Sequence, residues 1–259
     1  MRHLQGEEET MANSNHFLFD VDGTLTPSRQ KIDDNLKTFL LSFMIENKVS
    51  FVTGSDISKT IEQLGTTLTS KSRYNFNCSG NSITSGPDNI EVIYESQWKP
   101  SDKLLEFLNK SLILSNCPTK TGSHIEERPG SINFSIVGRN CTKDQRRRYV
   151  QYDTEHNERQ TLQKLIESNF PDVSAVVGGE TGIDIFEKNK DKRQVLQYIP
   201  EEETVIFFGD MMQQGGNDRP LLDEIRKTNR GLSYNVVDWE HTYDILYWNY
   251  PVFPYKNMH

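Results

Sequence analysis

The 259-residue chain is predicted to form an α/β protein, in which a Rossmann-like core with a parallel sheet is split by an inserted α+β domain. One observation predicts the core: short segments rich in aromatic and β-branched residues recur near both ends of the chain, and each ends in small or acidic residues. A second observation predicts the insert: in the middle of the chain, strand-like segments follow one another through turns, which is typical of an antiparallel sheet.

The core elements begin close to the N-terminus. Four segments have the character of buried parallel strands, at residues 16–21, 49–55, about 74–78 and 204–210. Between the first two, apolar residues from Ile32 to Met44 recur at helical spacing, and Asp33 is placed to cap that helix. A further helix is expected from about Asn217. Because an open parallel sheet places its site at the carboxyl ends of its strands, the functional residues are expected there.

The insert is expected between about residues 89 and 188. It contains a helix at 101–114, a strand pair around SHIEERPGSINFSIVG, a polar helix from 142 to 168, and two strands, VSAVVGG and TGIDIF. This pattern predicts an antiparallel sheet with helices on one face. We therefore expect a disordered tail (1–15), a core domain built from two segments (16–88 and 189–259), and a cap domain (89–188) inserted between those segments. Hinges are expected at 86–89 and 188–191.

Composition excludes several classes of protein. The formal charge of −8 and the pI of about 5.3 provide no basic surface for nucleic acid or an anionic membrane. Cys78, Cys117 and Cys141 are odd in number and lack C-x-x-C spacing, so we expect free thiols in a reducing compartment and a cytoplasmic protein. No long apolar run or signal-peptide pattern is found, so no membrane association is expected.

The stretch FLFDVDGTLT places Asp20 and Asp22 on one face where the first strand ends. Two carboxylates this close repel each other unless a cation neutralises them, and Mg²⁺ prefers such oxygen ligands. One carboxylate can then attack phosphorus as a nucleophile, and the other can transfer a proton to the leaving oxygen. The D-x-D-G pattern alone is equally typical of a turn or a calcium loop.

Other strand ends supply the groups that a metal-held phosphoryl group needs. They are hydroxyls, an ammonium and further oxygen ligands: Thr53, Ser55, Lys192, Asp210, Asn217 and Asp218. Each could stand alone in an ordinary turn. Their occurrence in this order, each at a strand end or the start of a helix, instead favours a phosphoryl-transfer site.

This order of motifs resembles the haloacid dehalogenase (HAD) superfamily. Five segments together resemble the eukaryotic-type phosphomannomutase family, with a cap of type C2b. They are LFDVDGTLT, GSD, RPGSINFSIVGR, GG followed by D and F, and FFGD followed by GGND. The resemblance covers residues 17–246. It implies that Asp20 is the nucleophile, Asp22 the general acid and base, and Lys192 with Thr53 and Ser55 the phosphate stabilisers. It also implies Mg²⁺ on Asp20, the backbone carbonyl of Asp22, and Asp210, near Asn217 and Asp218.

Four arginines are candidates for binding a second phosphate: Arg29, Arg128, Arg139 and Arg146. One guanidinium group can donate two parallel hydrogen bonds to two oxygens of a phosphate. A cluster of arginines facing the metal would therefore hold the non-reacting phosphate of a sugar. The resemblance implies that Asn133 and Asp184 contact the sugar or the cap backbone. It also implies a homodimer formed through the cap.

The resemblance implies a phosphomannomutase that interconverts mannose 1-phosphate and mannose 6-phosphate through a phospho-aspartate, with hexose 1,6-bisphosphate as activator. The resemblance also implies glucose phosphates as further substrates and a role in mannose metabolism and GDP-mannose biosynthesis. One alternative is a Mg²⁺-dependent HAD sugar-phosphate phosphatase, which needs no second phosphate site. Another, of a different class, is a non-catalytic sugar-phosphate-binding protein.

The sequence departs from the family pattern around the expected sugar site. A Glu-Asn-Gly turn is replaced by residues 78–80 (CSG), a serine by Gly182, a tryptophan by Lys190, and a loop containing lysine and proline by MMQQ after Asp210. These changes leave the phosphoryl-transfer residues complete. They affect the residues expected to position the sugar.

Overall fold

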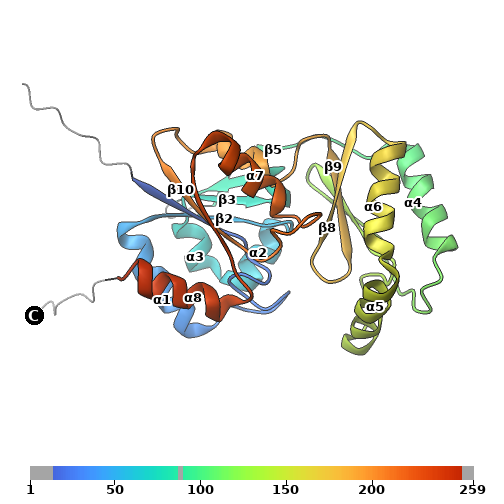
Figure 1. Ribbon diagram of the computed structural model, residues 1–259, viewed down its shortest axis with the longest axis horizontal. Coiled ribbons are helices and arrows are strands. Elements are labelled where there is room, and N and C mark those ends of the chain that lie inside the picture. The colour runs from blue at the N-terminus through green and yellow to red at the C-terminus, as the bar shows by residue number, and fades with distance from the viewer. Residues whose placement is uncertain (1–13, 87–89, 253–259) are drawn as a thin grey trace, which may run out of the picture.

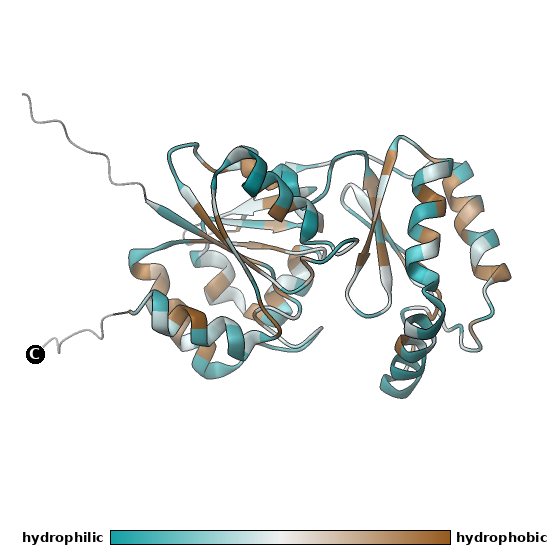
Figure 2. Ribbon diagram, viewed as in Figure 1, coloured by the Kyte–Doolittle hydropathy of each residue, from teal (hydrophilic) through white to brown (hydrophobic). Residues whose placement is uncertain are grey.

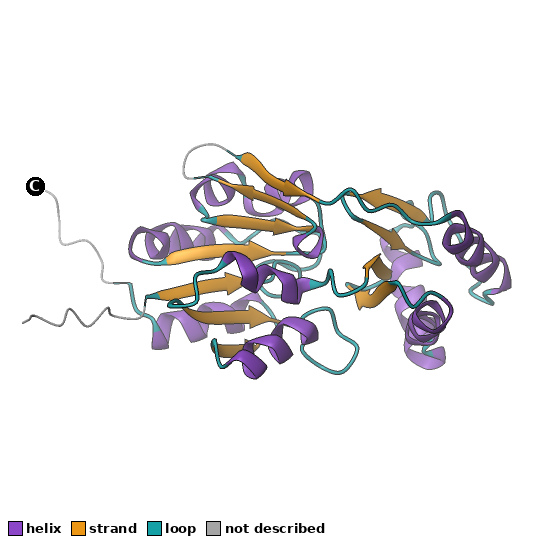
Figure 3. Ribbon diagram, turned by 90° about the horizontal axis from the view of Figure 1, so that it is seen from above, coloured by secondary structure: helices purple, strands orange, loops and turns teal. Residues whose placement is uncertain are grey.

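The computed structural model describes residues 14–86 and 90–252. The predicted tail therefore lies almost wholly outside the described residues. A large sheet forms one half of the molecule, and a smaller sheet with its own helices forms the other (Figures 1 and 3). No helix among the described residues is long and apolar enough to cross a membrane.

The large sheet has the strand order β11-β10-β1-β2-β3-β4-β5. Its strands are β1 (Asn15–Phe19), β2 (Lys48–Val52), β3 (Tyr74–Asn77), β4 (Ser82–Ser85), β5 (Glu91–Glu95), β10 (Thr204–Gly209) and β11 (Gly231–Asn235). The first five strands in this order run parallel, and β4 and β5 add an antiparallel edge. The four strands predicted from the sequence are β1, β2, β3 and β10.

Helices cover both faces of the large sheet. One face carries α1 (Asp34–Glu46), α2 (Ile57–Leu64), α3 (Thr66–Lys71) and α8 (Trp239–Asn249), and the other carries η2 (Lys192–Tyr198) and α7 (Arg219–Thr228). Alternation along β1 explains this: Phe17 and Phe19 join the first core, and Leu18 joins the second. The brown strand segments between the two helix layers in Figure 2 follow these cores. Asp33 caps α1 as predicted, because its side chain accepts hydrogen bonds from the amides of Asn35 and Leu36.

The smaller sheet has the order β6-β7-β9-β8 and is antiparallel throughout. It consists of β6 (Ile125–Arg128), β7 (Ser131–Phe134), β8 (Val173–Gly178) and β9 (Gly182–Glu187), with α4 (Asp102–Leu114), α5 (Lys143–His156) and α6 (Glu158–Asn169) on one face. Ile132 and Ile185 pack in the core beneath these helices. The alternate residues Asn133 and Asp184 point to the opposite face, toward the large domain. The predicted α+β insert is confirmed.

Two details differ from the sequence predictions. The polar segment 142–168 is two helices, because Asn157 adopts a left-handed conformation (φ 52°) that ends α5 and starts α6. Residues 91–95, expected in the cap, form β5 and pair with β4 in the large sheet. The segment 86–89, predicted as a hinge, therefore joins two strands of one sheet, and its residues 87–89 lie outside the described residues.

Candidate active site

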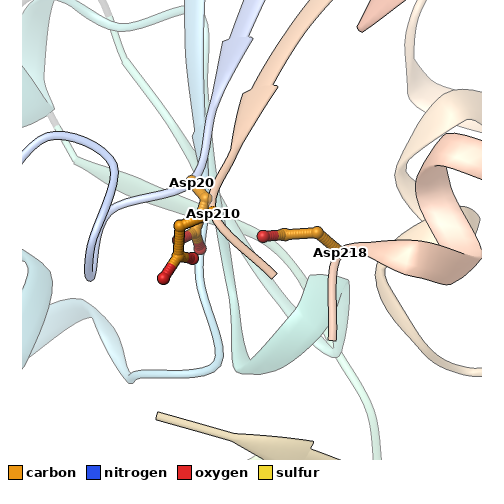
Figure 4. A group of neighbouring side chains, drawn as sticks. All are labelled: Asp20, Asp210 and Asp218. Atoms are coloured by element: carbon orange, nitrogen blue, oxygen red, sulfur yellow. The ribbon is translucent and has the colours of Figure 1, made fainter. Parts of the chain in front are cut away.

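Parallel pairing brings the predicted acidic residues together at the carboxyl edge of the large sheet. Phe19 on β1 is in register with Phe208 on β10, and the Asp20 amide donates a hydrogen bond of 2.9 Å to the Phe208 carbonyl. Asp20 and Asp210 therefore leave neighbouring strands side by side, and Asp218 reaches toward them from the loop before α7 (Figure 4). Strand register alone brings together two aspartates that lie far apart in the sequence.

Asp20, Asp210 and Asp218 form an acidic triad. A carboxylate oxygen from each lies within 4.8 Å of the others, and Asp20 and Asp218 are buried. Burial and, to a smaller extent, the negative charge of Asp218 raise the pKa of Asp210 to about 7. Such crowding of carboxylates is relieved by a cation.

Lys192 supplies one positive charge to this triad. Its Nζ donates to Asp20 Oδ1 at 2.5 Å and to Asp218 Oδ1 at 2.7 Å, and its side chain is fully buried. Burial lowers the pKa of the Lys192 ammonium, but the two aspartates outweigh it, so the pKa is raised and the group stays charged. Asp218 also accepts the Met211 amide through Oδ2 at 3.0 Å. Both oxygens of Asp218 are thus engaged, and this residue orients Lys192 and the loop after β10.

The remaining oxygens fit a hard divalent cation. Asn217 Oδ1 is buried and has no hydrogen-bond partner among the described residues, and Asn217 lines the same cleft as Asp20 and Asp210. An orphaned amide oxygen in the same cleft as two carboxylates is the kind of oxygen ligand that Mg²⁺ accepts. The side chain of Asp22 does not belong to the triad.

Asp22 is held by a separate set of contacts. Its Oδ1 accepts hydrogen bonds from the backbone amide of Arg29 at 2.7 Å and from Gln63 Nε2 at 3.0 Å. The next residue, Gly23, has φ 82°, and a Cβ there would overlap the Asp210 carboxylate. The glycine of the D-x-D-G motif is therefore required by the close approach of Asp210. Gln63 on α2 was not identified from the sequence, because nothing in its helix marks it.

Thr53 and Ser55 lie in the loop that follows β2. The turn of residues 78–80 supports this loop: the Ser79 amide donates to the Thr53 carbonyl at 2.8 Å, and the Cys78 amide donates to the Ser55 carbonyl at 2.9 Å. Cys78, Ser79 and Gly80 all have positive φ, and the amides of Cys78 and Ser79 point at the loop. Burial raises the pKa of the Cys78 thiol to about 12, so it is an inert group. The CSG turn acts through backbone atoms.

The cap contributes a row of polar residues across its sheet. Register places Glu126 opposite Asn133 and Asn133 opposite Asp184. Asn133 Nδ2 donates to Asp184 Oδ1 at 2.5 Å, and Arg128 Nη1 lies 3.3 Å from the same oxygen. Arg128 Nη1 also donates to the Gly54 carbonyl of the core at 2.6 Å. This hydrogen bond joins the cap to the loop after β2.

Two other arginines of the cluster, Arg139 and Arg146, are each paired with a carboxylate. Arg139 Nη2 lies 2.5 Å from Glu126 Oε2, and Arg146 Nη1 lies 3.1 Å from Glu180 Oε2. Burial, followed by the positive charge of Arg128, lowers the pKa of Arg139 to about 10. Sequence reasoning did not identify Glu126 or Glu180, because both look like ordinary surface charges in the sequence.

A single cleft between the core and the cap collects most of the predicted residues. Its lining includes Asp20, Asp22, Arg29, Thr53, Ser55, Arg128, Asn133, Arg139, Arg146, Asp184, Asp210 and Asn217. Lys192 and Asp218 are absent from the lining because they lie behind Asp20. The lining combines the carboxylates at the edge of the large sheet with four arginines, which suits a ligand that carries two anionic groups.

The sequence comparisons agree on one family. The sequence model of the family "Eukaryotic phosphomannomutase" matches residues 36–248. The chain is 34% identical over 232 residues to a phosphomannomutase of Nicotiana benthamiana, a match that covers 87% of this chain and 90% of the relative. It is 33% identical over 238 residues to the phosphomannomutase of Saccharomyces cerevisiae, covering 88% of this chain and 91% of the relative.

Solved structures resemble the fold at low sequence identity. A trehalose-6-phosphate phosphatase related protein superimposes with a TM-score of 0.55 at 15% identity, covering 90% of this chain and 96% of the other. The sucrose-phosphatase of Synechocystis gives a TM-score of 0.52 at 12% identity, covering 91% of this chain and 97% of the other. These likenesses support the HAD-like fold.

Proposed function

Because the chain belongs to the eukaryotic phosphomannomutase family, we propose that it interconverts mannose 1-phosphate and mannose 6-phosphate through a phospho-aspartate on Asp20. The observation that carries this proposal is one cleft that is lined both by Asp20 and Asp210 and by four arginines. A phosphatase needs only the carboxylates. A mutase must hold a sugar by whichever phosphate is not reacting.

The proposed cycle begins with Asp20 phosphorylated by hexose 1,6-bisphosphate. The 6-hydroxyl of mannose 1-phosphate attacks the phosphorus on Asp20, Asp22 accepts the hydroxyl proton, and the acyl-phosphate bond breaks. The resulting bisphosphate reorients, and Asp20 attacks the phosphorus at C1. Asp22 then returns its proton to the departing O1, which yields mannose 6-phosphate and regenerates phospho-Asp20. Glucose phosphates share these groups and are proposed as further substrates.

The contacts of Asp22 and Lys192 support these roles. Asp22 uses Oδ1 for both of its hydrogen bonds among the described residues, so Oδ2 is left to exchange a proton with the sugar. Lys192 holds Oδ1 of Asp20, and its charge offsets the charge that develops during transfer. We propose that Mg²⁺ is held by Asp20, the Asp22 carbonyl, Asp210 and Asn217, with Asp218 nearby. The bound ion would neutralise the carboxylates and the transferring phosphoryl group.

The cap residues support binding of the second phosphate. Arg29, Arg139 and Arg146 line the cleft with Arg128, and all four carry charge at neutral pH. Asn133 and Asp184, hydrogen-bonded to each other, are proposed to contact the sugar. Thr53 and Ser55, in the loop after β2, are proposed to bind the transferring phosphoryl group.

A single assay tests the proposal. Purified protein is incubated with Mg²⁺, mannose 1-phosphate and a trace of hexose 1,6-bisphosphate, and the products are separated. Mannose 6-phosphate is expected. Free phosphate as the main product would identify a phosphatase, and no product with tight sugar-phosphate binding would identify a binding protein.

The Asp20→Asn variant tests the nucleophile. We expect it to lose at least about 10⁴-fold in turnover, because an amide cannot form the acyl phosphate. Asp223→Asn, a surface change on α7, is the matched control and should keep full activity. Turnover by Asp20→Asn near the control rate would contradict the covalent step.

We also propose that the protein acts in the cytoplasm as a homodimer joined through its cap. Three free cysteines support a reducing compartment. On the cap helix α4, Ile113 and Leu114 are 78% and 79% exposed, which supports an interface there. Light scattering of the wild type and of Ile113→Glu tests the dimer. A monomeric wild type would contradict it.

A further inference from the structure

We propose that Glu126 is a positioning residue, which holds the guanidinium groups of Arg128 and Arg139 ready for the non-reacting phosphate of the substrate. This inference rests on the proposed mutase function, and it names the residue on which the second phosphate site depends. Glu126 belongs to β6 and sits on the same strand face as Arg128, two residues further on.

Glu126 bridges the two arginines. Its Oε1 accepts a hydrogen bond from Arg128 Nε at 3.0 Å, and its Oε2 lies 2.5 Å from Arg139 Nη2. Glu126 does not line the cleft that contains Asp20, but lines a second cavity, which Arg128 and Arg139 line as well. A phosphate in the catalytic cleft can therefore bind the arginines while Glu126 keeps its contacts.

Arg128 is already committed to holding the cap. Its Nε is bound to Glu126, and its Nη1 is bound to the Gly54 carbonyl and lies near Asp184. Arg139 differs: its Nη2 forms the ion pair with Glu126, and its buried Nε has no hydrogen-bond partner among the described residues. The N–H groups that Glu126 does not hold can be donated to phosphate oxygens. Arg139 is thus the residue prepared to receive the anion.

The charge of Glu126 is what allows this cluster to form. Arg29, Arg128 and Arg139 all line both cavities. Their positive charges therefore lie close to one another and repel. Glu126 is the carboxylate that Arg139 pairs with in the described structure. Without the charge of Glu126, the side chain of Arg139 gains freedom to turn away from Arg128. Its guanidinium group would then have to be ordered again each time a phosphate binds.

The Glu126→Gln variant tests this inference, with the neighbouring Glu127→Gln as the matched control. Glu127 is also on β6, but its side chain is 65% exposed and its ion pair with Lys99 is 3.9 Å long. For Glu126→Gln we expect KM for mannose 1-phosphate to rise about tenfold, the loss typical of one charged hydrogen bond, with kcat within about twofold of the wild type. Glu127→Gln should match the wild type in both constants.

Calorimetric titration with mannose 6-phosphate gives a readout independent of turnover, and Kd should rise by the same factor as KM. Glu126→Asp, which keeps the charge, should recover part of the loss and also serves if Glu126→Gln does not fold. An unchanged or lower Kd in Glu126→Gln, or a Glu126→Asp variant as weak as Glu126→Gln, would overturn the inference. If the wild type itself neither binds nor converts sugar phosphates, the proposed function fails instead.

Discussion

At the scale of single residues, the site is organised by buried charges that share partners. Lys192 joins Asp20 to Asp218, and Gln63 joins the loop containing Asp22 to α2. At Asp22, both hydrogen bonds go to Oδ1. At Asp20, Lys192 binds Oδ1, and Oδ2 accepts a longer hydrogen bond of 3.4 Å from Thr24 Oγ1. In each carboxylate, Oδ1 thus carries the shorter contacts.

This arrangement makes a prediction for Lys192. Its replacement by glutamine leaves three neighbouring carboxylates without a cation, so we expect the free energy of unfolding to fall by about 3 kcal/mol in Mg²⁺-free buffer. Added Mg²⁺ should recover part of this loss, because the ion binds the same carboxylates in the folded state. Urea denaturation with and without Mg²⁺ measures both effects.

Lys227→Gln is the control for this measurement. Its ammonium pairs with Glu224 on the surface of α7 and is 74% exposed, so its loss should leave stability unchanged. If Lys192→Gln is as stable as Lys227→Gln, the ion pairs at Asp20 do not support the fold.

At the scale of helices and strands, the opposite edge of the large sheet carries a second buried charge cluster. His16 at the start of β1 contacts Glu203 through Nδ1 at 2.9 Å and Ser50 through Nε2 at 2.8 Å. Glu203 also binds Lys48 and Arg73. Burial lowers the pKa of His16 despite the opposing effect of Glu203. Burial pushes the pKa of Glu203 upward, but hydrogen bonds from Lys48, His16 and Arg73 outweigh this and lower it to about 2.

These shifts predict how stability depends on pH. Folded His16 resists a proton that the unfolded chain accepts below about pH 6.5, so stability should fall as the pH drops from 7 to 5. The contribution of Glu203 is complete above about pH 4.5 and is lost as the pH falls toward 2. Urea denaturation of the wild type and of His16→Gln at pH 7 and pH 5 measures the first effect. A fall of equal size in both proteins would contradict the role of His16.

Strand ends were predictable from the sequence, and contacts across the sheets were not. The apolar segments before Asp20 and Asp210 predicted strands whose carboxyl ends carry the site, and both were confirmed as β1 and β10. The strand β5 was missed although its central residues, VIY, are β-branched or aromatic, because it is a short, largely exposed edge strand that carries no residue of the site. Glu126 was missed for a related reason: its importance comes from its register opposite Asn133 and its reach to Arg139.

At the scale of the whole molecule, the site is complete only because the cap rests on the core. Arg128 donates to the Gly54 carbonyl, and Val177 of β8 forms a β-bridge with Gly216 in the loop before α7. The second contact ties the cap to the loop that carries Asn217. The contact between cap and core thus places the cap arginines in the same cleft as Asp20 and Asp210.

Gly54→Ala tests this closed arrangement. A Cβ at Gly54 would lie 2.8 Å from Asp184 Oδ2, so the cap would have to move away from the loop. We expect kcat/KM to fall about tenfold while the melting temperature stays within about 2 °C, because the clash lies between domains. Gly178→Ala, whose Cβ would lie 2.7 Å from the same oxygen, places its clash within the cap sheet and serves as the comparison that disturbs Asp184 without involving the core loop. Wild-type kinetics in Gly54→Ala would show that the contact between cap and core is not part of the working site.

The covalent step can be tested by chemical trapping. The protein is mixed with hexose 1,6-bisphosphate and Mg²⁺, treated with borohydride, which reduces an acyl phosphate to an alcohol, and digested for mass spectrometry. We expect homoserine at position 20 in the peptide that contains FLFDVDGTLT, with Asp22 and Asp210 unchanged. Reduction at Asp22 or Asp210 instead, or no reduced aspartate in a protein that is turning over, would contradict a phospho-aspartate on Asp20.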